Sequence, residues 1–436
     1  MYQEPSINPS LENMKEACAA AGHPERAYSI IQITGTNGKT STSRIIEQLL
    51  IAEGVKTALY TSPSLICETE RIRVNGIDIS KEQLTTARAS AVEAAASVGL
   101  KLTDFEEMTL AMFIHLRETK VDIAVIEVGM GGRWDATSAA DPAVAVITAL
   151  GLDHQEFLGE TVEEIGFDKS HIIKPGSSVI LGESIFHHPP HIADIFLDRA
   201  HSFGLHPRCV SSESFTVNSS SPLKTNFEVT TPHAHYKDLT IAGPAYQASN
   251  AATAFFAAEA ALGRALDTGA TQKAIARTTF PGRFEVVLKD KNTGKPKLIF
   301  DGSHNPAAIQ ILAELIAEMT AETGEKPIIA LGILKDKDAE GMIKALAPVT
   351  TDFIAIEPPN PRAIPVSELA SLIERLTDTT PLATFPQRTA MDALLNITGK
   401  QPVIVTGSLS LYPLLQSIRL CAVDPCPESR VEDTES

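Results

Sequence analysis

Short apolar runs alternate with stretches of helical periodicity along the first half of the chain. Continuous apolar runs of this length are typical of strands buried on both faces of a parallel sheet. The pattern predicts a helix from about Thr40 to Glu53. The predicted strands are 28–34, 55–61, 121–129, 142–150 and 177–182. Strands that alternate with helices in this way indicate an α/β fold.

Residues 205–240 have a different pattern, with Ser, Thr and His between short alternating stretches. We expect small antiparallel strands and loops there, within the first domain. The apolar stretch that begins near Ser249 predicts a helix packed into that domain. A Pro-Gly pair then interrupts the helical pattern between Thr279 and Gly282, which indicates a domain boundary.

Beyond this boundary, four further apolar runs predict strands separated by helices: KLIFDG, PIIALGI, DFIAIEP and PVIVTGS. They describe a second, smaller Rossmann-like domain over residues 281–420. The polar residues 421–436 predict a disordered tail.

Composition narrows the class of protein. With 436 residues, 43% of them hydrophobic and 21% charged, the chain can bury two cores. Its formal charge of −17 argues against nucleic acid or an anionic membrane as a partner, and no run reaches transmembrane length. Five scattered cysteines and the absence of a signal-like N-terminus lead us to expect reduced thiols and a cytoplasmic enzyme.

The segment Gly35–Ser41 follows an apolar strand and opens a helix. Glycines let backbone N–H groups approach phosphate oxygens, and the helix N-terminus favours an anion. Lys39 would reach the β- and γ-phosphates of ATP, and the Thr40 hydroxyl would contact Mg²⁺. The expected ATP contacts in this loop are Thr36, Asn37, Gly38, Lys39, Thr40 and Ser41. We therefore expect residues 1–280 to form a P-loop-type parallel-sheet ATPase domain.

The loop GTNGKTS resembles the shortened phosphate loop of the Mur ligase superfamily of ATP-dependent amide ligases. Further segments are similar, in order, to the folylpolyglutamate synthase and dihydrofolate synthase branch. They are SPSLICETERIRVNG (62–76), TDFEEMTLAMF (103–113), IEVGMGGRWDATSA (126–139), LDHQEFLG (152–159), DKSHIIKPG (168–176), FPGRFEVV (280–287), FDGSHNPAA (300–308) and LGILKDKD (331–338). The resemblance spans roughly residues 10–415, and the ordered set is far more specific than any one segment.

The resemblance implies an ATP-dependent carbon–nitrogen ligase that adds L-glutamate to dihydropteroate, to (tetrahydro)folate, or to both. In that reaction a carboxylate attacks the γ-phosphate of ATP, and the glutamate amine displaces phosphate from the resulting acyl phosphate. The expected co-substrate is ATP, with Mg²⁺ and a monovalent cation as cofactors. The expected partners are small molecules only, and the resemblance implies a monomer.

The expected metal and catalytic residues come partly from their place at a predicted strand end and partly from the resemblance. Glu127 ends an apolar strand at the edge where ligands of α/β proteins collect, so it is a candidate Mg²⁺ ligand beside Thr40. The resemblance adds Ser62 and His154 to the metal site. It also implies that Lys169 is carbamylated, and it places Lys39, Lys169 and His304 among the catalytic residues.

The remaining roles come from the resemblance. It assigns Asn250 to the adenine, Arg283 to an ATP phosphate, Asp301 to the ribose and His304 to the neighbourhood of glutamate or ATP. The expected pterin-binding residues are Phe105, Glu106, Trp134 and Asp135. Positive charge near the anionic substrates is expected from Arg71, Arg73 and Arg133.

Several positions depart from the branch's pattern. Thr40 is typical of the cell-wall Mur ligases, and Ser64 stands where the branch has His. These departures leave open whether the acid is dihydropteroate, a folate or both. Two other functions also stay open: a cell-wall ligase that uses a UDP-linked muramyl peptide, and a nucleotide-binding regulator without catalysis.

Overall fold

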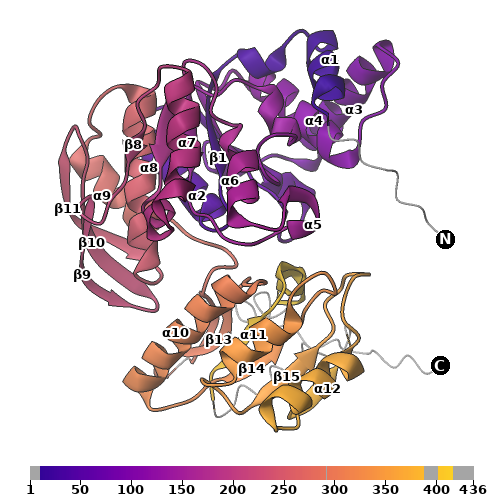
Figure 1. Cartoon of the computed structure of the whole chain (residues 1–436), viewed down its shortest axis with the longest axis vertical. Helices are drawn as coiled ribbons and strands as arrows, with labels where there is room; N and C mark the ends of the chain where they lie inside the picture. Colours follow the sequence, from indigo (N-terminus) through magenta and orange to yellow (C-terminus); the bar gives the residue numbers. More distant parts are fainter. Residues whose placement is uncertain (1–9, 291, 387–400, 416–436) are drawn as a thin grey trace, which may run out of the picture. The chain divides into compact units, whose positions relative to one another are not determined.

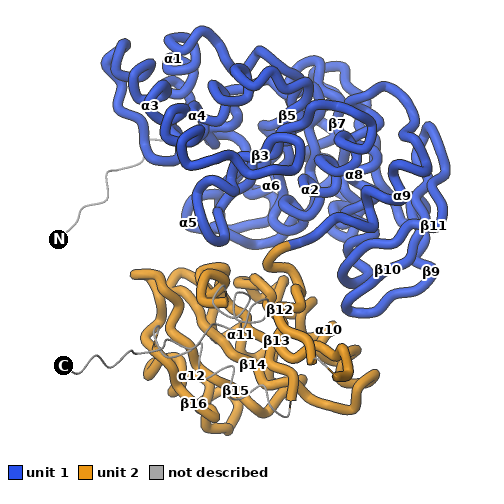
Figure 2. The backbone as a smooth tube through the Cα atoms, turned by 180° about the vertical axis from the view of Figure 1, so that it is seen from behind, with its two compact units in different colours: residues 1–280 blue, residues 281–436 orange. Residues whose placement is uncertain are grey.

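The computed structural model describes residues 10–290, 292–386 and 401–415. The chain divides into two compact units, Met1–Phe280 and Pro281–Ser436 (Figures 1 and 2). Each unit contains its own largely parallel sheet with helices, which confirms the α/β prediction. The tail predicted at 421–436 lies outside the described residues. Among the described helices, none is both long and apolar enough to cross a bilayer.

The main sheet of the first unit has eight strands in the order β4-β3-β2-β5-β1-β6-β7-β8. Its strands are β1 (Ser29–Thr34), β2 (Thr57–Tyr60), β3 (Ile72–Val74), β4 (Ile77–Asp78), β5 (Ile123–Glu127), β6 (Val144–Ile147), β7 (Ser178–Leu181) and β8 (Arg208–Cys209). All pair in parallel except β3 and β4, which form an antiparallel edge. The five predicted strands are β1, β2, β5, β6 and β7.

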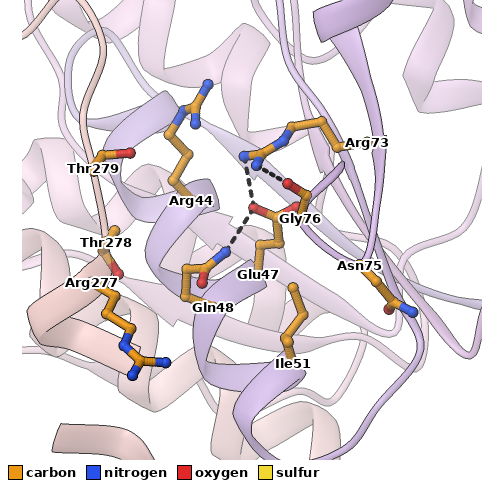
Figure 3. Close-up of a pocket in the computed structure, with 10 residues that line it drawn as sticks. All are labelled: Arg44, Glu47, Gln48, Ile51, Arg73, Asn75, Gly76, Arg277, Thr278 and Thr279. Carbon is orange, nitrogen blue, oxygen red and sulfur yellow. Dashed lines mark hydrogen bonds and ion pairs between the residues drawn. The ribbon is translucent and has the colours of Figure 1, made fainter. Parts of the chain in front are cut away.

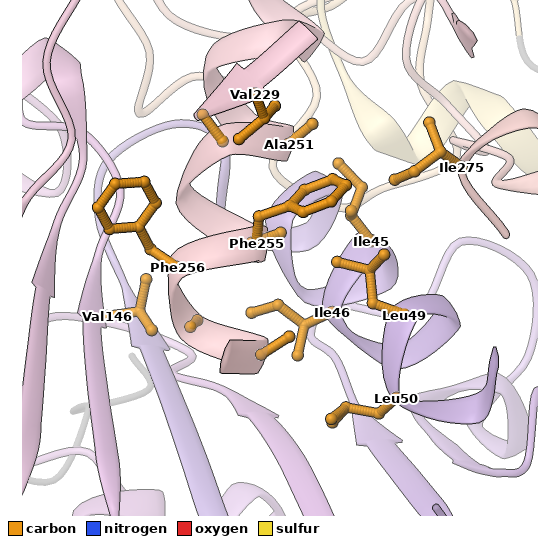
Figure 4. Packing of buried hydrophobic residues seen from close by; sticks show 14 of the residues in the cluster. Ile45, Ile46, Leu49, Leu50, Val146, Val229, Ala251, Phe255, Phe256 and Ile275 are labelled. Carbon is orange, nitrogen blue, oxygen red and sulfur yellow. The ribbon is translucent and has the colours of Figure 1, made fainter. Parts of the chain in front are cut away.

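Helices cover both faces of this sheet because alternate residues of each strand point to opposite sides. Along β1, Ile31 and Ile33 belong to one core and Ile30 to another. The first core contains α2 (Lys39–Ala52), α8 (Tyr246–Leu262) and α9 (Thr268–Arg277), whose side chains interdigitate in Figure 4. The opposite face carries α1 (Glu12–Ala20), α3 (Lys81–Ser97), α4 (Asp104–Thr119), α6 (Val162–Ser170) and α7 (Pro190–Ser202).

A three-stranded antiparallel sheet forms within the region of small strands predicted from the sequence. It consists of β9 (Phe215–Ser221), β10 (Lys224–Thr230) and β11 (His235–Ala242). Phe227, Val229 and Tyr236 bury their side chains in the same core as α8, so this sheet is part of the first unit.

The second unit has a six-stranded sheet in the order β12-β13-β17-β14-β15-β16. The strands are β12 (Glu285–Lys289), β13 (Pro296–Phe300), β14 (Ile328–Leu331), β15 (Phe353–Ile356), β16 (Ala383–Phe385) and β17 (Val403–Thr406). Its helices include α10 (Pro306–Thr323), α11 (Ala339–Leu346) and α12 (Val366–Thr377). Because β17 lies between β13 and β14, the strand order reverses beside the turn that follows β13, where α/β proteins commonly bind ligands.

Candidate active site

The phosphate loop lies where three central strands end. In the sheet register Ile33 of β1 is level with Glu127, the last residue of β5, and Thr34 is level with Ile147 of β6. Since parallel strands place their carboxyl ends at one edge, the loop after β1 lies between Glu127 and the residues that follow β6. The fold therefore brings together segments that are far apart in the sequence.

The loop is held from the β6 side. The Thr36 N–H donates to the Ala149 carbonyl (2.7 Å), and the Thr148 hydroxyl donates to the Asn37 carbonyl (2.7 Å). Gly38 has a φ of 83°, and a Cβ at this position would lie 2.7 Å from Oδ1 of Asn250. Asn250, expected at the adenine, thus lies against the loop. Thr148 was not expected from the sequence as a site residue, although it lies near the end of the predicted strand 142–150.

Lys39 folds back over its own loop. Its Nζ donates to the carbonyls of Gly35 (2.7 Å) and Thr36 (3.2 Å). Ser41, also expected at ATP, is buried in the first turn of α2. An ammonium group near the backbone N–H groups of a helix N-terminus provides positive charge and donors suited to phosphate.

Two of the four predicted metal ligands are in direct contact. The Thr40 hydroxyl lies 2.8 Å from Oε1 and 3.0 Å from Oε2 of Glu127, whose side chain is only 1% exposed. A hydroxyl and a buried carboxylate at the phosphate loop are the hard oxygen ligands that Mg²⁺ prefers. These two residues therefore fit a magnesium ion.

The other two predicted metal ligands are Ser62 and His154. Tyr60 of β2 is level with Ile126, so Ser62 follows the same sheet edge as Glu127. His154 precedes the short helix α5 (Gln155–Leu158) and has an exposed ring. Its backbone N–H donates to Oδ1 of Asp153 (3.0 Å). Within residues 10–290, 292–386 and 401–415, no group of three or more His, Cys, Asp or Glu side chains is arranged to hold a metal.

Lys169 is buried beneath the loop. Its Nζ donates to the Gly35 carbonyl (3.1 Å), the same oxygen that Lys39 contacts. Burial, and then the charge of Lys39, lowers the pKa of Lys169 to about 7. A neutral amine is therefore well populated at this position near neutral pH.

Two of the expected pterin residues flank a glycine. A Cβ at Gly129 would lie 2.6 Å from Cζ of Phe105 and 3.1 Å from Oδ2 of Asp135. Burial raises the pKa of Asp135, although its carboxylate accepts hydrogen bonds from the Met130 N–H (3.0 Å) and the Thr137 hydroxyl (2.6 Å). The arrangement pairs an aromatic ring with a desolvated carboxylate, which can receive N–H donors of a flat heterocycle.

The other two residues expected at the pterin, Trp134 and Glu106, differ in exposure and in their contacts. Trp134 is 42% exposed, with the Arg133 guanidinium 4.6 Å from its ring centroid. Glu106 accepts from the Thr103 N–H (2.8 Å) and forms the capping box of α4. The structure thus gives Glu106 a helix-capping contact, and it leaves Trp134 available as a stacking surface.

Two of the arginines expected near the anionic substrates, Arg71 and Arg73, lie in different surroundings. Arg71 is buried, donates to the Tyr60 hydroxyl (2.7 Å) and lies over the Phe105 ring at 5.6 Å. Arg73 forms ion pairs with Glu47 (3.1 Å) and Asp78 (3.1 Å). Arg71 therefore belongs with the Phe105 group, whereas Arg73 points to the α2 side of the sheet.

Asp168 was not expected from the sequence as a site residue, but it organises the glycine-rich loop after β5. Its Oδ1 accepts from the N–H groups of Gly132 (2.8 Å) and Arg133 (3.2 Å), and a Cβ at Gly131 would lie 2.2 Å from that oxygen. The sequence feature that could have identified Asp168 as a site residue is its position next to Lys169 in the segment DKSH.

The second unit groups three predicted residues around the turn after β13. Asp301 is buried, and its carboxylate accepts from the N–H groups of Phe284 (2.8 Å) and Ser303 (2.9 Å). Nδ1 of His304 lies 2.8 Å from the Gly302 carbonyl, and a Cβ at Gly302 would lie 2.7 Å from Nη1 of Arg283. Asp301, His304 and Arg283 thus surround one tight turn at the carboxyl edge of the second sheet.

Comparison with known families matches both units. The family model of the Mur ligase middle domain matches residues 33–258, and that of the Mur ligase glutamate ligase domain matches residues 282–409. Together with the phosphate loop and the Thr40–Glu127 pair, these matches define an ATP-dependent ligase of the Mur type.

Individual relatives show which family of Mur-type ligases the chain resembles. The dihydrofolate synthase/folylpolyglutamate synthase of Escherichia coli is 32% identical over 365 residues, which cover 84% of this chain and 81% of that protein. A Halobacterium salinarum relative, named as a probable bifunctional folylpolyglutamate synthase/dihydropteroate synthase, is 32% identical over 92% of this chain. The chain spans about half (48%) of that longer protein. The chain belongs to the folylpolyglutamate synthase and dihydrofolate synthase family of ATP-dependent glutamate ligases.

Solved structures agree with this family. Mycobacterium tuberculosis folylpolyglutamate synthase complexed with ADP superimposes with a TM-score of 0.84 at 28% identity, covering 95% of each chain. A bifunctional folylpolyglutamate synthase/dihydrofolate synthase with Mn, AMPPNP and L-glutamate bound gives a TM-score of 0.79 at 25% identity, covering 97% of this chain and 95% of that one.

Proposed function

We propose that this protein uses ATP to join L-glutamate to a pteridine-bearing acid: dihydropteroate, a tetrahydrofolate, or both. The observation that carries the proposal is the contact between Thr40 and Glu127 beside the phosphate loop of a Mur ligase fold. The relatives solved with ADP, and with Mn, AMPPNP and L-glutamate, support the same choice of nucleotide, metal and amino acid.

The phosphate loop would bind and orient ATP. Lys39 and the N-terminal N–H groups of α2 would hold the β- and γ-phosphates, while Thr40 and Glu127 would hold Mg²⁺, with Ser62 and His154 as further candidates. The metal would supply charge neutralisation for the transferring phosphoryl group. The acid's carboxylate oxygen attacks the γ-phosphorus and ADP leaves; the glutamate amine then attacks the acyl carbon, and phosphate leaves as the amine loses a proton.

The acid would bind through its pterin ring. Phe105 and Trp134 offer aromatic surfaces, and the buried Asp135 offers acceptors for ring N–H groups. Arg71, over the Phe105 ring, adds a cation beside this surface. Glu106 is retained as a proposed pterin neighbour, with helix capping as its observed contact.

The remaining roles follow the resemblance. We propose Asn250 for the adenine, Asp301 for the ribose, Arg283 for an ATP phosphate and His304 for the glutamate neighbourhood. The clustering of the last three around one turn of the second unit supports a shared ligand role. We also propose a monomer that acts in the cytoplasm and uses a monovalent cation.

Lys169 is proposed to carry a carbamate. Carbamate forms when a neutral amine attacks CO₂ and releases a proton, and the pKa of about 7 supplies that neutral amine. The test replaces Lys169 by Ala and adds short carboxylic acids such as formate. Partial recovery of turnover would support a carboxylate at this position, whereas recovery with short amines alone would contradict it.

The activity itself is tested with ATP, Mg²⁺, L-glutamate and either dihydropteroate or tetrahydrofolate. We expect ADP release that depends on the pteridine, with a product one glutamyl unit heavier by mass spectrometry. ADP release with a UDP-linked muramyl peptide instead would indicate the cell-wall ligase reaction. ATP binding without product from any acid would indicate a nucleotide-binding regulator.

A further inference from the structure

A second polar cavity lies in the first unit, further along the helix that follows the phosphate loop. It has a volume of about 310 Å³ and is bounded by α2, by the turn between β3 and β4, and by residues 277–279 at the end of α9 (Figure 3). We call it the α2 arginine pocket, and its lining includes Arg44, Glu47, Gln48, Arg73 and Thr279. Apart from the positive charge that was expected of Arg73 near the substrates, no role assigned above involves these residues.

Arg44 is the unusual member of this lining. Its guanidinium is half-buried, yet it forms no hydrogen bond or ion pair with another residue in the described part of the chain. Burial, and then the charge of Arg73, lowers the pKa of Arg44. A partly desolvated cation without a partner is costly, and an anion from solution would relieve that cost.

The charges of Glu47, Asp78 and Glu127 raise the pKa of Arg44 and so partly offset its burial, but none of these carboxylates forms an ion pair with it. Nη1 of Arg73 pairs with Oε2 of Glu47 (3.1 Å), and its Nε pairs with Asp78 (3.1 Å). Glu47 is fully buried, and its second oxygen has no hydrogen-bond partner among the described residues. In Figure 3 the heads of Arg44 and Arg73 lie on the same side of α2, while Arg277 points away.

Further polar groups line this space. The Gln48 amide and the Thr279 hydroxyl join the Arg44 guanidinium along the lining. The volume of about 310 Å³ holds a phosphate or carboxylate group together with several waters, since one water occupies about 30 Å³ of liquid. The size of the pocket and the guanidinium of Arg44, which has no ion pair among the described residues, both match a small oxyanion.

We propose that the α2 arginine pocket binds a small oxyanion, a phosphate or a carboxylate, with Arg44 as its principal contact. Bound there, the anion ties residues 277–279 to α2, the helix whose first turn carries Lys39 and Thr40. The site therefore connects the end of the first unit to the phosphate-loop helix. The inference is independent of which acid the enzyme ligates.

The test uses hydrogen exchange of the full chain without turnover, with inorganic phosphate as the first probe. We expect phosphate to slow exchange in the peptide containing Arg277, Thr278 and Thr279. In Arg44→Gln, which leaves that peptide unchanged, the apparent Kd for this protection should rise about tenfold or more, because one charge-assisted contact is lost. Arg44→Lys should recover part of the affinity.

Two control variants distinguish binding in this pocket from phosphate bound at the phosphate loop and from a general loss of positive charge. Lys39→Ala removes the phosphate-loop lysine and should leave protection of residues 277–279 intact. Arg375→Gln removes an equal charge from an exposed pair with Glu340 and should also leave it intact. A γ-linked glutamyl dipeptide, used in place of phosphate, shows whether carboxylates or phosphate bind more tightly.

Either of two results would overturn the proposal: no phosphate protection of residues 277–279 in the wild type, or undiminished protection in a folded Arg44→Gln protein. If Arg44→Gln does not fold, Thr279→Val is the second variant, with weakened protection expected and unchanged protection again contradictory. Loss of ligase activity alone does not bear on this site.

Discussion

At the scale of single residues, the Thr40–Glu127 contact argues against a charged strand end that faces water, and it supports the proposed magnesium site. Glu127 is buried at 1% exposure, and both its oxygens lie within 3.0 Å of one hydroxyl. A carboxylate is kept in such a place only with compensating partners, which here include a hydroxyl and, in the proposed enzyme, a cation.

Replacing Glu127 by Gln tests this site directly. The amide retains an acceptor for Thr40 but loses the charge that would hold Mg²⁺, so turnover should fall about 100-fold or more while the fold persists. The measurement is ADP release across a Mg²⁺ titration, with the melting temperature as a check on folding.

Thr40 provides the matched pair of variants. Thr40→Ser keeps the hydroxyl and should retain most of the activity, whereas Thr40→Val should lose it. An unaltered Mg²⁺ response in Glu127→Gln would contradict the assignment of this carboxylate to the metal.

Lys169 makes stability depend on pH. Its pKa is about 7 in the folded protein and near 10.5 when exposed. Between these values the unfolded chain binds more protons than the folded one, so the free energy of unfolding should rise with pH across this window. Below about pH 7 both states are protonated, and the destabilisation is complete.

The comparison is between the wild type and Lys169→Met in CO₂-free buffer, by urea denaturation at pH 7 and pH 9. The wild type should gain more stability over this interval than the variant. Equal gains in the two proteins would show that the amine is not titrating in this range.

At the scale of elements, the turn between β1 and α2 depends on Gly38. Its φ of 83° is in the left-handed region, and a Cβ would meet Oδ1 of Asn250 at 2.7 Å. Gly54, just after the other end of α2, has a φ of 79° with open space around it. The two glycines thus share a backbone conformation but differ in what a side chain would meet.

Substituting each by Ala separates these effects. Gly54→Ala should cost about 1 kcal/mol of stability from backbone strain alone. Gly38→Ala should cost more and should also weaken ADP binding, because either the loop or Asn250 must move. Denaturation and ADP titration measure both, and equal costs with unchanged ADP affinity would contradict the close packing at Gly38.

At the scale of the whole molecule, the first unit depends on a core that joins its two sheets. Phe255 of α8 is fully buried, and its ring centroid lies 4.7 Å from that of Tyr236 in β11. This pair connects the small antiparallel sheet to the helix that packs beside α2.

Phe255→Ala should therefore destabilise the first unit by about 3–5 kcal/mol. Phe157→Ala, at a side chain that is 58% exposed, should change stability by no more than about 0.5 kcal/mol. Trp134 is the chain's single tryptophan and lies in the first unit, so its fluorescence follows the urea unfolding of that unit. Similar losses in both variants would argue against the central role of this core.

The sequence was sufficient for the elements whose signals are local. Continuous apolar runs marked β1, β2, β5, β6 and β7, and glycines followed by Lys39 marked the phosphate loop between a strand and a helix. The family followed as well, because many short segments matched in order. The antiparallel strand β12 and the three-residue β16 were not predicted, since their short runs are not distinct from loops in the sequence.

The tertiary structure decided what depends on neighbours distant in the chain. The contact of Thr40 with Glu127, the burial that shifts the pKa of Lys169, and the anchoring of the glycine-rich loop by Asp168 all join separate segments. Arg44 is an ordinary helix arginine in the sequence, and only packing shows it lining a cavity with no partner among the described residues. Local pattern sets backbone conformation, whereas desolvation and charge pairing depend on which elements pack together.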